Sequence, residues 1–164
     1  ASTGTFEAFE KRDENNKKFL GKSVYSAIKI INVNISKRLR GQDVHNQEKI
    51  DALMINLDGS RQKKKLGANS ILAVSMAVKK LSAKINGLPL YRAFYIKKNF
   101  KLPFPLMNII NGGAHANNGL RIQEFMIRPD RAKSFSEAMR ICYLVIKNLS
   151  SLLKKKTFID FSRR

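Results

Sequence analysis

Apolar side chains in the first hundred residues recur at the spacing of amphipathic helices. From Ser23 to Arg40 they recur about every 3.6 residues, which predicts a helix that Gly41 ends. A second helix is predicted from about Gln47 to Leu57, with Asn46 as its N-cap.

A third predicted helix, from about Asn69 to Ile85, is apolar around most of its circumference, which favours a central position. Asn86–Gly87 and then Pro89 are placed to end it. Packing of the three helices against one another would give the chain a core. The candidate core residues are Ile28, Ile31, Leu53, Leu57, Leu72, Val74 and Val78.

The pattern changes near residue 100. A short helical piece from Leu90 to Lys97 leads into the segment Pro103–Pro105, which we take as the boundary between a domain at 1–100 and a domain at 101–164. Two apolar runs follow, Leu106–Ile110 and Ile122–Ile127, and they read as short strands joined by a glycine-rich loop.

A long amphipathic helix is predicted after the second strand. Ser134 and Glu137 have the spacing of a capping box, which marks its start. Its predicted inward face consists of Ala138, Ile141, Val145, Leu149, Leu152 and Leu153. With strands limited to two short runs, the residues present are mostly helical.

The loop between the two strands holds the candidate chemistry. It carries His115, one of two histidines in the chain, and Gln123–Glu124 interrupts the apolar pattern just beyond it. Gly112–Gly113 allows the backbone to fold tightly under the histidine. A lone loop histidine is more often a solvated surface residue, and a glutamate at a strand edge is usually exposed, so the pattern alone leaves both interpretations open.

The formal net charge is +20, from 32 Lys and Arg against 12 Asp and Glu. Such a field attracts nucleic acid or anionic membranes, so a basic protein that binds RNA without sequence preference is an alternative function. The basic residues are scattered, however, and no aromatic residues are interleaved with them as stacking platforms. Lys, Asn and Ile also share A/T-rich codons, so compositional bias is another explanation. We interpret Lys63–Lys65 as a solvated loop without a catalytic role.

Composition limits the remaining classes of protein. With 43% hydrophobic residues the chain falls in the globular range. It has no run of about 18 apolar residues that could span a membrane and no signal segment, so a cytoplasmic location is expected. The single cysteine, Cys142, lies in the last helix and is predicted to be a buried, inert thiol.

Five blocks of sequence, in this order, resemble the enolase family. They read ASTGTFEAFEKRD from Ala1, LDGSRQKKKLGANSILAVSMAV from Leu57, LPLYRAF from Leu88, LMNIINGGAHANNGLRIQEFMI from Leu106, and SFSEAMR from Ser134. The resemblance extends to about Lys156 and departs from the family at Arg61, which replaces an acid. It implies an α/β fold class: the helical portion of an α+β small domain, followed by the start of a (β/α)₈ barrel. The remaining barrel, the strands of the small domain and the family's continuation after the last helix are not among these 164 residues, so the fold is expected to be incomplete at both ends.

The same resemblance implies a glycolytic activity, the Mg²⁺-dependent interconversion of 2-phosphoglycerate and phosphoenolpyruvate. On this basis Ser2 matches a loop serine that supplies oxygens to a second Mg²⁺, and His115 matches a mobile-loop histidine near the substrate phosphate. Glu124 matches a catalytic carboxylate near the reacting hydroxyl, and Gln123 matches the substrate-binding amide beside it. If Glu124 shares one strand face with Ile122 and Met126, it points into the barrel near its mouth.

The resemblance does not place the whole site on this sequence. The family's barrel lysine base, its three metal-binding carboxylates and its acidic Gly-Asp-Glu-Gly-Gly segment have no counterpart here. A polypeptide of these 164 residues is therefore expected to be inactive alone, and a second polypeptide that completes the barrel is a further alternative. Enolases are homodimers, but the resemblance does not carry the dimer interface over.

Overall fold

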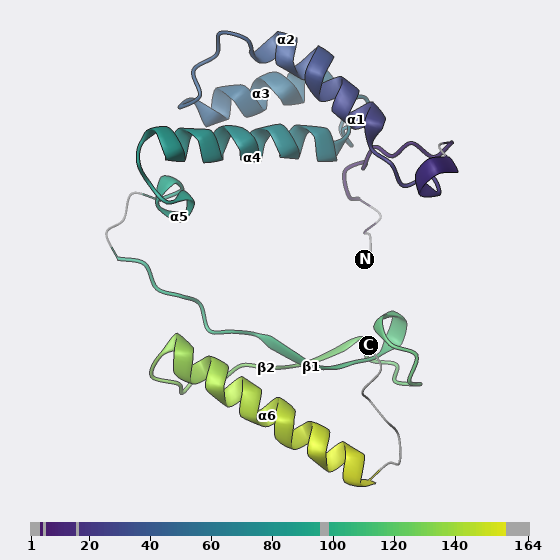
Figure 1. Ribbon diagram of the computed structural model, residues 1–164, viewed down its shortest axis with the longest axis vertical. Coiled ribbons are helices and arrows are strands. Elements are labelled where there is room, and N and C mark those ends of the chain that lie inside the picture. The colour runs from purple at the N-terminus through teal and green to yellow at the C-terminus, as the bar shows by residue number, and fades with distance from the viewer. Residues whose placement is uncertain (1–3, 5, 16, 96–98, 157–164) are drawn as a thin grey trace. The chain divides into compact units, whose positions relative to one another are not determined.

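The computed structural model describes residues 4, 6–15, 17–95 and 99–156 and divides the chain into two compact units. Unit 1 is residues 1–98 and is helical, whereas unit 2 is residues 99–164 and combines two strands with one long helix (Figure 1). About half of the chain is helical. Among the described residues, no helix is long and apolar enough to cross a membrane.

Three helical elements in unit 1 follow one another without a break and form one continuous helical segment. They are α1 (Tyr25–Ile30), the π-helix η2 (Ile31–Ile35) and α2 (Ser36–Leu39). Gly41 follows with a φ of +76°, a left-handed conformation that favours glycine, so the predicted end of this helix is confirmed. The π turn in the middle was not predicted from the apolar spacing.

The next helices follow the predictions closely. Helix α3 is Gln47–Asp58, and the Asn46 side chain caps it by accepting a hydrogen bond from the Lys49 N–H (3.1 Å). Helix α4 is Ala68–Ile85 and ends at Asn86 and Gly87. Helix α5 is only Leu90–Ala93, shorter than the predicted Leu90–Lys97, and residues 96–98 lie outside the described part of the chain. A short 3₁₀ turn, η1, occupies Lys17–Phe19.

The core of unit 1 lies between the continuous segment formed by α1, η2 and α2 and the two helices α3 and α4. Its buried members are Ile35, Ile50, Met54 and Leu66, and the partly buried Ile31, Val74 and Val78 pack against it. Three predicted core residues are wrong, because Ile28, Leu57 and Leu72 are exposed. Apolar spacing identified the helices but did not show how far around each helix the burial extends.

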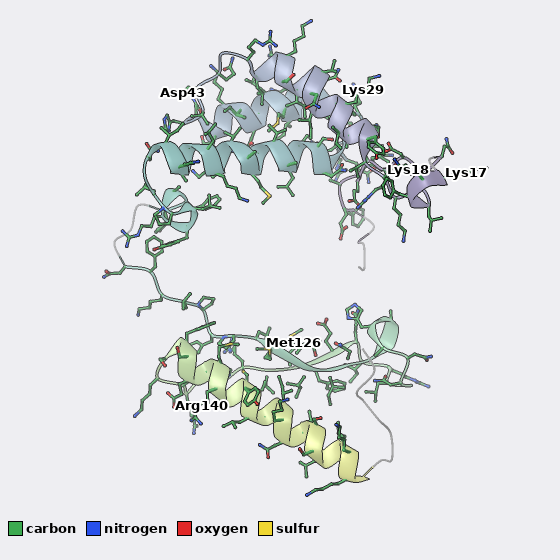
Figure 2. All side chains as sticks on the ribbon, viewed as in Figure 1. Lys17, Lys18, Lys29, Asp43, Met126 and Arg140 are labelled. Carbon is green, nitrogen blue, oxygen red and sulfur yellow. The ribbon has the colours of Figure 1, made fainter. Side chains whose placement is uncertain are left out.

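Helix α4 is not enclosed by the described residues of its own unit. It contacts α1, α3 and α5, yet Leu72 and Met76 are at least half exposed. Figure 2 shows side chains projecting from α4 on the side away from α3. Helix α4 therefore lies among the other helices of unit 1, as predicted, but its apolar circumference exceeds what these helices cover.

Asp58, the last residue of α3, organises the turn into α4. Its buried carboxylate accepts hydrogen bonds from the Leu66 N–H (2.7 Å) and from the N–H and hydroxyl of Ser60. Burial raises the pKa of the Asp58 carboxyl, but these hydrogen bonds outweigh burial and lower the pKa below its ordinary value. Within this turn Lys64 and Lys65 are exposed, as predicted for a solvated loop, whereas Lys63 is half-buried and its Nζ donates to the Ser60 carbonyl (3.1 Å).

The segment at residues 9–11 is fixed against the start of α4. The Phe9 N–H donates to the Gln62 carbonyl (2.7 Å), and the Ala68 N–H donates to the Phe9 carbonyl (2.8 Å). Asn69 then pairs with the Lys11 backbone in both directions. Gly67, with a φ of +88°, permits this approach, because a Cβ there would lie 2.6 Å from the Lys11 Cβ.

Unit 2 begins with two antiparallel strands, β1 (Met107–Asn111) and β2 (Glu124–Ile127). Met107 pairs with Ile127 and Asn111 pairs with Glu124, with an irregular register between Asn108 and Ile110. A 3₁₀ turn, η3 (Gly113–His115), lies in the connection. Strand β2 begins two residues later than predicted, so Ile122 does not share a strand face with Glu124.

The long helix α6 is Phe135–Lys156. The Ser134 hydroxyl accepts from the Glu137 N–H (3.1 Å), as predicted, but the Glu137 carboxylate takes the Lys133 N–H (2.7 Å) instead of that of Ser134. Ala138 and Cys142 are fully buried, which confirms the buried thiol. Val145 and Leu152, predicted to face inward, are exposed.

Candidate active site

The loop between β1 and β2 folds tightly because of its two glycines. The Gly112 N–H donates to the Gln123 carbonyl (2.8 Å), and the Gly113 N–H donates to the Leu120 carbonyl (2.7 Å). A Cβ at Gly112 would lie 2.3 Å from the Ile122 carbonyl oxygen, and Gly113 has a φ of +53°. Side chains at these positions would push the two arms of the loop apart.

This fold places His115 against both members of the Gln123–Glu124 pair. The His115 Nε2 lies 2.7 Å from the Gln123 Nε2, and the His115 Nδ1 lies 3.2 Å from the Glu124 Oε1. The side chains of His115 and Glu124 are each about one third exposed. The histidine is therefore bracketed by an amide and a carboxylate while remaining open to solvent.

Three of the four residues predicted for the site come together in this way. The fourth, Ser2, lies outside the described residues. Glu124 is the first residue of β2, and its position follows from the end of the strand rather than from the predicted strand face. The functional roles of these residues remain predictions.

Asparagines that the sequence analysis did not single out hold the loop in shape. The Asn118 side chain donates to the Asn111 carbonyl (2.8 Å), and its oxygen accepts from the Leu120 N–H (3.2 Å). The Asn108 amide also donates to the Asn111 side chain. Asparagine side chains readily bond nearby backbone, so the high Asn content of this segment was an available signal.

The donors at this site do not form a metal centre. In the part of the chain that the structure describes, no three His, Cys, Asp or Glu side chains are grouped to hold a metal ion. Mg²⁺ prefers an octahedral set of oxygen ligands, usually including carboxylates. His115 and Glu124 supply one carboxylate and one nitrogen, so these described residues do not fit a Mg²⁺ ion.

The other histidine has a structural environment. His45 Nδ1 lies 3.1 Å from the Ser82 hydroxyl and 3.4 Å from the Asn86 side-chain nitrogen. These contacts join the segment before α3 to the end of α4. Neither an acid nor a base lies among these two partners, so we assign His45 no chemistry.

A polar hollow of 780 Å³ lies in unit 1 and is lined by Phe9, residues 11–15, Lys17 and Ser26. Two of its charged groups, Arg12 and Asp13, are engaged within the unit. Arg12 donates to the Lys22 carbonyl (2.8 Å) and to Glu10 (2.6 Å). Asp13 accepts from the Ser23 hydroxyl (2.7 Å) and the Tyr25 N–H (2.6 Å). Hydrogen bonds from serine side chains and the start of α1 lower the pKa of Asp13 to about 2. Asp13 thus caps α1, and we assign the hollow no ligand.

Comparison with known proteins identifies the family. The family model described as "Enolase, N-terminal domain" matches residues 1–94, and the model described as "Enolase, C-terminal TIM barrel domain" matches residues 99–161. The first match covers more than half of the chain. The chain belongs to the enolase family.

Two curated relatives show how close and how partial the match is. The enolase of Pelagibacter ubique (strain HTCC1062) is 70% identical over 156 residues, which are 95% of this chain and 37% of the relative. The enolase of Methanosarcina acetivorans is 51% identical over 156 residues, 95% of this chain and 36% of the relative. The chain thus spans a little over a third of the length of these enolases.

The family matches confirm the predicted fold class. The helices of unit 1 fall within the N-terminal family match, and β1, β2 and α6 fall within the barrel match. The predicted resemblance to enolase is therefore confirmed. His115, Gln123 and Glu124 all lie in the stretch that matches the TIM barrel domain.

Proposed function

We propose that this chain carries the substrate-positioning part of an enolase site, which acts in the glycolytic interconversion of 2-phosphoglycerate and phosphoenolpyruvate. The observation that carries the proposal is the grouping of His115, Gln123 and Glu124 at the start of β2, inside the stretch that matches the enolase barrel. The 70% identity to the Pelagibacter enolase over 95% of the chain supports it.

In this proposal the three residues have separate roles. The Glu124 carboxylate acts near the reacting hydroxyl, and its partial exposure leaves it accessible to a small substrate. The His115 ring lies in the loop and serves the substrate phosphate. Gln123 contacts the His115 ring, and that contact places its amide at the same site.

The requirement for a metal ion is part of what we propose, and the geometry of the described residues does not support it. We propose that Mg²⁺ is the cofactor and that Ser2 contributes oxygens to it, supported only by the N-terminal family match, which includes residue 2. No catalytic step is derived through the metal, since the described donors do not fit it. We likewise propose a cytoplasmic location, a small phosphorylated substrate, homodimerisation as a property of the family, and domains at 1–100 and 101–164.

A polypeptide of only these 164 residues should not interconvert the two substrates. Its sequence holds no counterpart of the family's lysine base, metal carboxylates or Gly-Asp-Glu-Gly-Gly acid, and the loss of one acid or base alone typically costs about 10²–10⁴-fold in rate. The test is a phosphoenolpyruvate absorbance assay with Mg²⁺, using protein made in a host strain without its own enolase. Sustained turnover would show that the site assignment is incomplete.

A chimera tests the positive half of the proposal. Replacing the matched stretch of the Pelagibacter enolase by residues of this chain should give an active, Mg²⁺-dependent enzyme, because 70% of the matched residues are the same. In this chimera Glu124→Gln, which keeps the shape of the side chain, should lower kcat by about 10²-fold or more. The matched control is Glu48→Gln, at an exposed position on α3. Equal kcat for the two variants would refute the role of Glu124.

The alternative of non-specific polyanion binding is not proposed, since neither family match favours it. Single cations among the described residues do contact aromatic rings. The Lys79 ammonium lies 5.2 Å from the centre of the Phe94 ring, and the Lys147 ammonium lies 5.6 Å from that of Tyr143. These are contacts within each unit. Figure 2 shows Lys17 and Lys18 on η1 and Lys29 on α1.

A further inference from the structure

The contact between Gln123 and His115 has a chemical consequence that the resemblance did not supply. We infer that Gln123 is a positioning residue, whose amide group holds the neutral His115 ring in the form that carries its proton on Nδ1. The family resemblance alone implies a substrate-binding role for Gln123. In the structure its side-chain nitrogen lies 2.7 Å from the His115 Nε2.

The hydrogen-bond donors around the ring determine where its proton lies. The Gln123 Nε2 carries two hydrogens and no available lone pair, so the ring nitrogen that faces it must accept. In neutral imidazole one nitrogen accepts and the other carries the proton, which places the proton on Nδ1. The Glu124 Oε1 lies 3.2 Å from that nitrogen, and a carboxylate favours a proton on the atom that faces it.

The other neutral form conflicts with both neighbours. A proton on Nε2 would point at the hydrogens of the Gln123 amide, and the lone pair on Nδ1 would then face the Glu124 carboxylate. If the amide were reversed, its oxygen could accept a proton from Nε2, but Nδ1 would need a proton as well to avoid repulsion from Glu124. A reversed amide therefore belongs to the imidazolium, whereas an amide whose nitrogen faces Nε2 belongs to the neutral ring.

The backbone explains how two consecutive residues reach one ring. Side chains of neighbouring strand residues point to opposite faces, so they rarely meet the same partner. Gln123 precedes the first residue of β2, and its carbonyl is held by the Gly112 N–H (2.8 Å). The close passage of Gly113, where a Cβ would lie 3.4 Å from the Gln123 Cα, brings η3 and its His115 against this junction.

This inference deepens the proposed function and rests on it for its catalytic meaning. A neutral ring of this form presents a lone pair at Nε2, and a fully ionised phosphate has no proton to share with it. Contact between Nε2 and such a phosphate therefore requires proton uptake by the ring and reversal of the Gln123 amide. The orientation of the Gln123 amide would thus determine whether the neutral or the protonated His115 ring contacts the ligand.

The proton position can be measured without any turnover. The chain contains two histidines, so long-range ¹H–¹⁵N spectra of the labelled protein show only two imidazole rings, and a His45→Gln variant assigns them. Spectra are recorded at a pH above the titration of both ring signals, measured in the same experiment, so that they report the neutral rings. We expect His115 to show a protonated Nδ1 and an unprotonated Nε2. The opposite pattern would overturn the inference.

Variants at the two neighbours separate positioning from folding. Gln123→Met removes the donor at similar length. Only Glu124 then favours the Nδ1 proton, so the fraction of rings that carry the proton on Nε2 should rise. Glu124→Gln keeps an oxygen that can accept from Nδ1 and should preserve the pattern. Gln123→Glu replaces the donor by an acceptor, and both ring nitrogens should then be protonated at a pH where the parent ring is neutral.

The set of variants remains decisive if one of them fails to fold. Unchanged backbone amide signals from α6 serve as the control for folding in each spectrum. If Nε2 stays unprotonated in both Gln123→Met and Gln123→Glu, the amide does not set the position of the proton. Because chimera activity plays no part in this measurement, failure here and failure of the proposed function are separate results.

Discussion

The two units differ in how they bury apolar side chains. Unit 1 encloses Ile35, Ile50 and Met54 almost completely between helices that are far apart in the sequence. Among the described residues of unit 2, the buried apolar side chains are only Ala138 and Cys142. Burial of a large aliphatic side chain contributes about 1.5–3 kcal/mol to the free energy of unfolding. Apolar burial within unit 1 therefore stabilises that unit much more than apolar burial within unit 2 stabilises unit 2.

Unit 2 instead leaves large apolar groups in water. Leu106 is 63% exposed, Ile122 is 58% exposed and Leu152 is 58% exposed. An apolar groove of 410 Å³ runs along α6, lined by Ile141, Leu144, Val145, Asn148, Leu149 and Leu152. Strands depend on neighbours for backbone hydrogen bonds, whereas helices satisfy most of their own. The same local rules thus produce an enclosed unit in one case and an open one in the other.

The largest expected effect is at the centre of unit 1. Met54→Ala should destabilise this unit by about 2–5 kcal/mol, because Met54 is fully buried and its removal leaves a cavity. The matched control is Leu72→Ala on α4, where the side chain is 59% exposed and the effect should be small. Urea unfolding followed by helical circular dichroism measures both. Similar losses for the two variants would remove the distinction between the enclosed and open faces.

The next effect concerns the turn before α4. Asp58→Ala should destabilise unit 1 by about 2–3 kcal/mol, because the buried Leu66 N–H loses its acceptor. Asp58→Asn keeps an acceptor oxygen and should cost less. Urea unfolding of the three chains gives this order, and equal loss in both variants would show that charge, rather than hydrogen bonding, is what the turn requires.

A smaller effect is expected at the start of α6. Ser134→Ala removes the hydroxyl that accepts from the Glu137 N–H, and such caps contribute about 1 kcal/mol. The loss should appear in hydrogen exchange of the first turn of α6 and leave α3 unchanged. Ser136→Ala, on the exposed surface of the same helix, is the control. Faster exchange in α3 as well would mean that the two units do not unfold separately.

Acid should weaken unit 1 through its aspartates. The pKa of Asp13 in the folded chain is about 2 against an ordinary value of 3.8, and the pKa of Asp58 is also lowered. A lowered folded pKa gives stability above the ordinary value that is lost as pH falls through the folded value. Thermal unfolding of unit 1 should therefore shift to lower temperature between about pH 4 and pH 2. Asp13→Asn should show a smaller shift, and no difference from the parent would exclude this cause.

Much of the fold followed from local sequence signals. Asn46, Gly41 and Ser134 marked helix ends correctly because capping and left-handed turns depend on the residue and its immediate neighbours. The exposed faces of α4 and α6 could not be predicted in the same way. Leu72 and Leu152 lie on apolar stripes, and only the elements packed around a stripe decide whether it is buried.

The candidate site shows the same limit. His115, Gln123 and Glu124 were selected from residue type and family resemblance, and the glycines gave a reason for a tight loop. These signals did not predict which nitrogen of the His115 ring each of the two neighbours contacts. That Gln123 would face one ring nitrogen and Glu124 the other depends on where β2 begins, and strand ends vary with tertiary pairing.

Hydrogen exchange on the purified chain tests the contrast between the units most directly. Amides of Leu72–Val78 in α4 should be strongly protected, since they lie in the helix that contacts three other helices of unit 1. Amides of Ile109, Ile110, Phe125 and Met126 should exchange much faster, because β1 and β2 have only each other as strand partners among the described residues. Equal protection of the two sets would contradict the account.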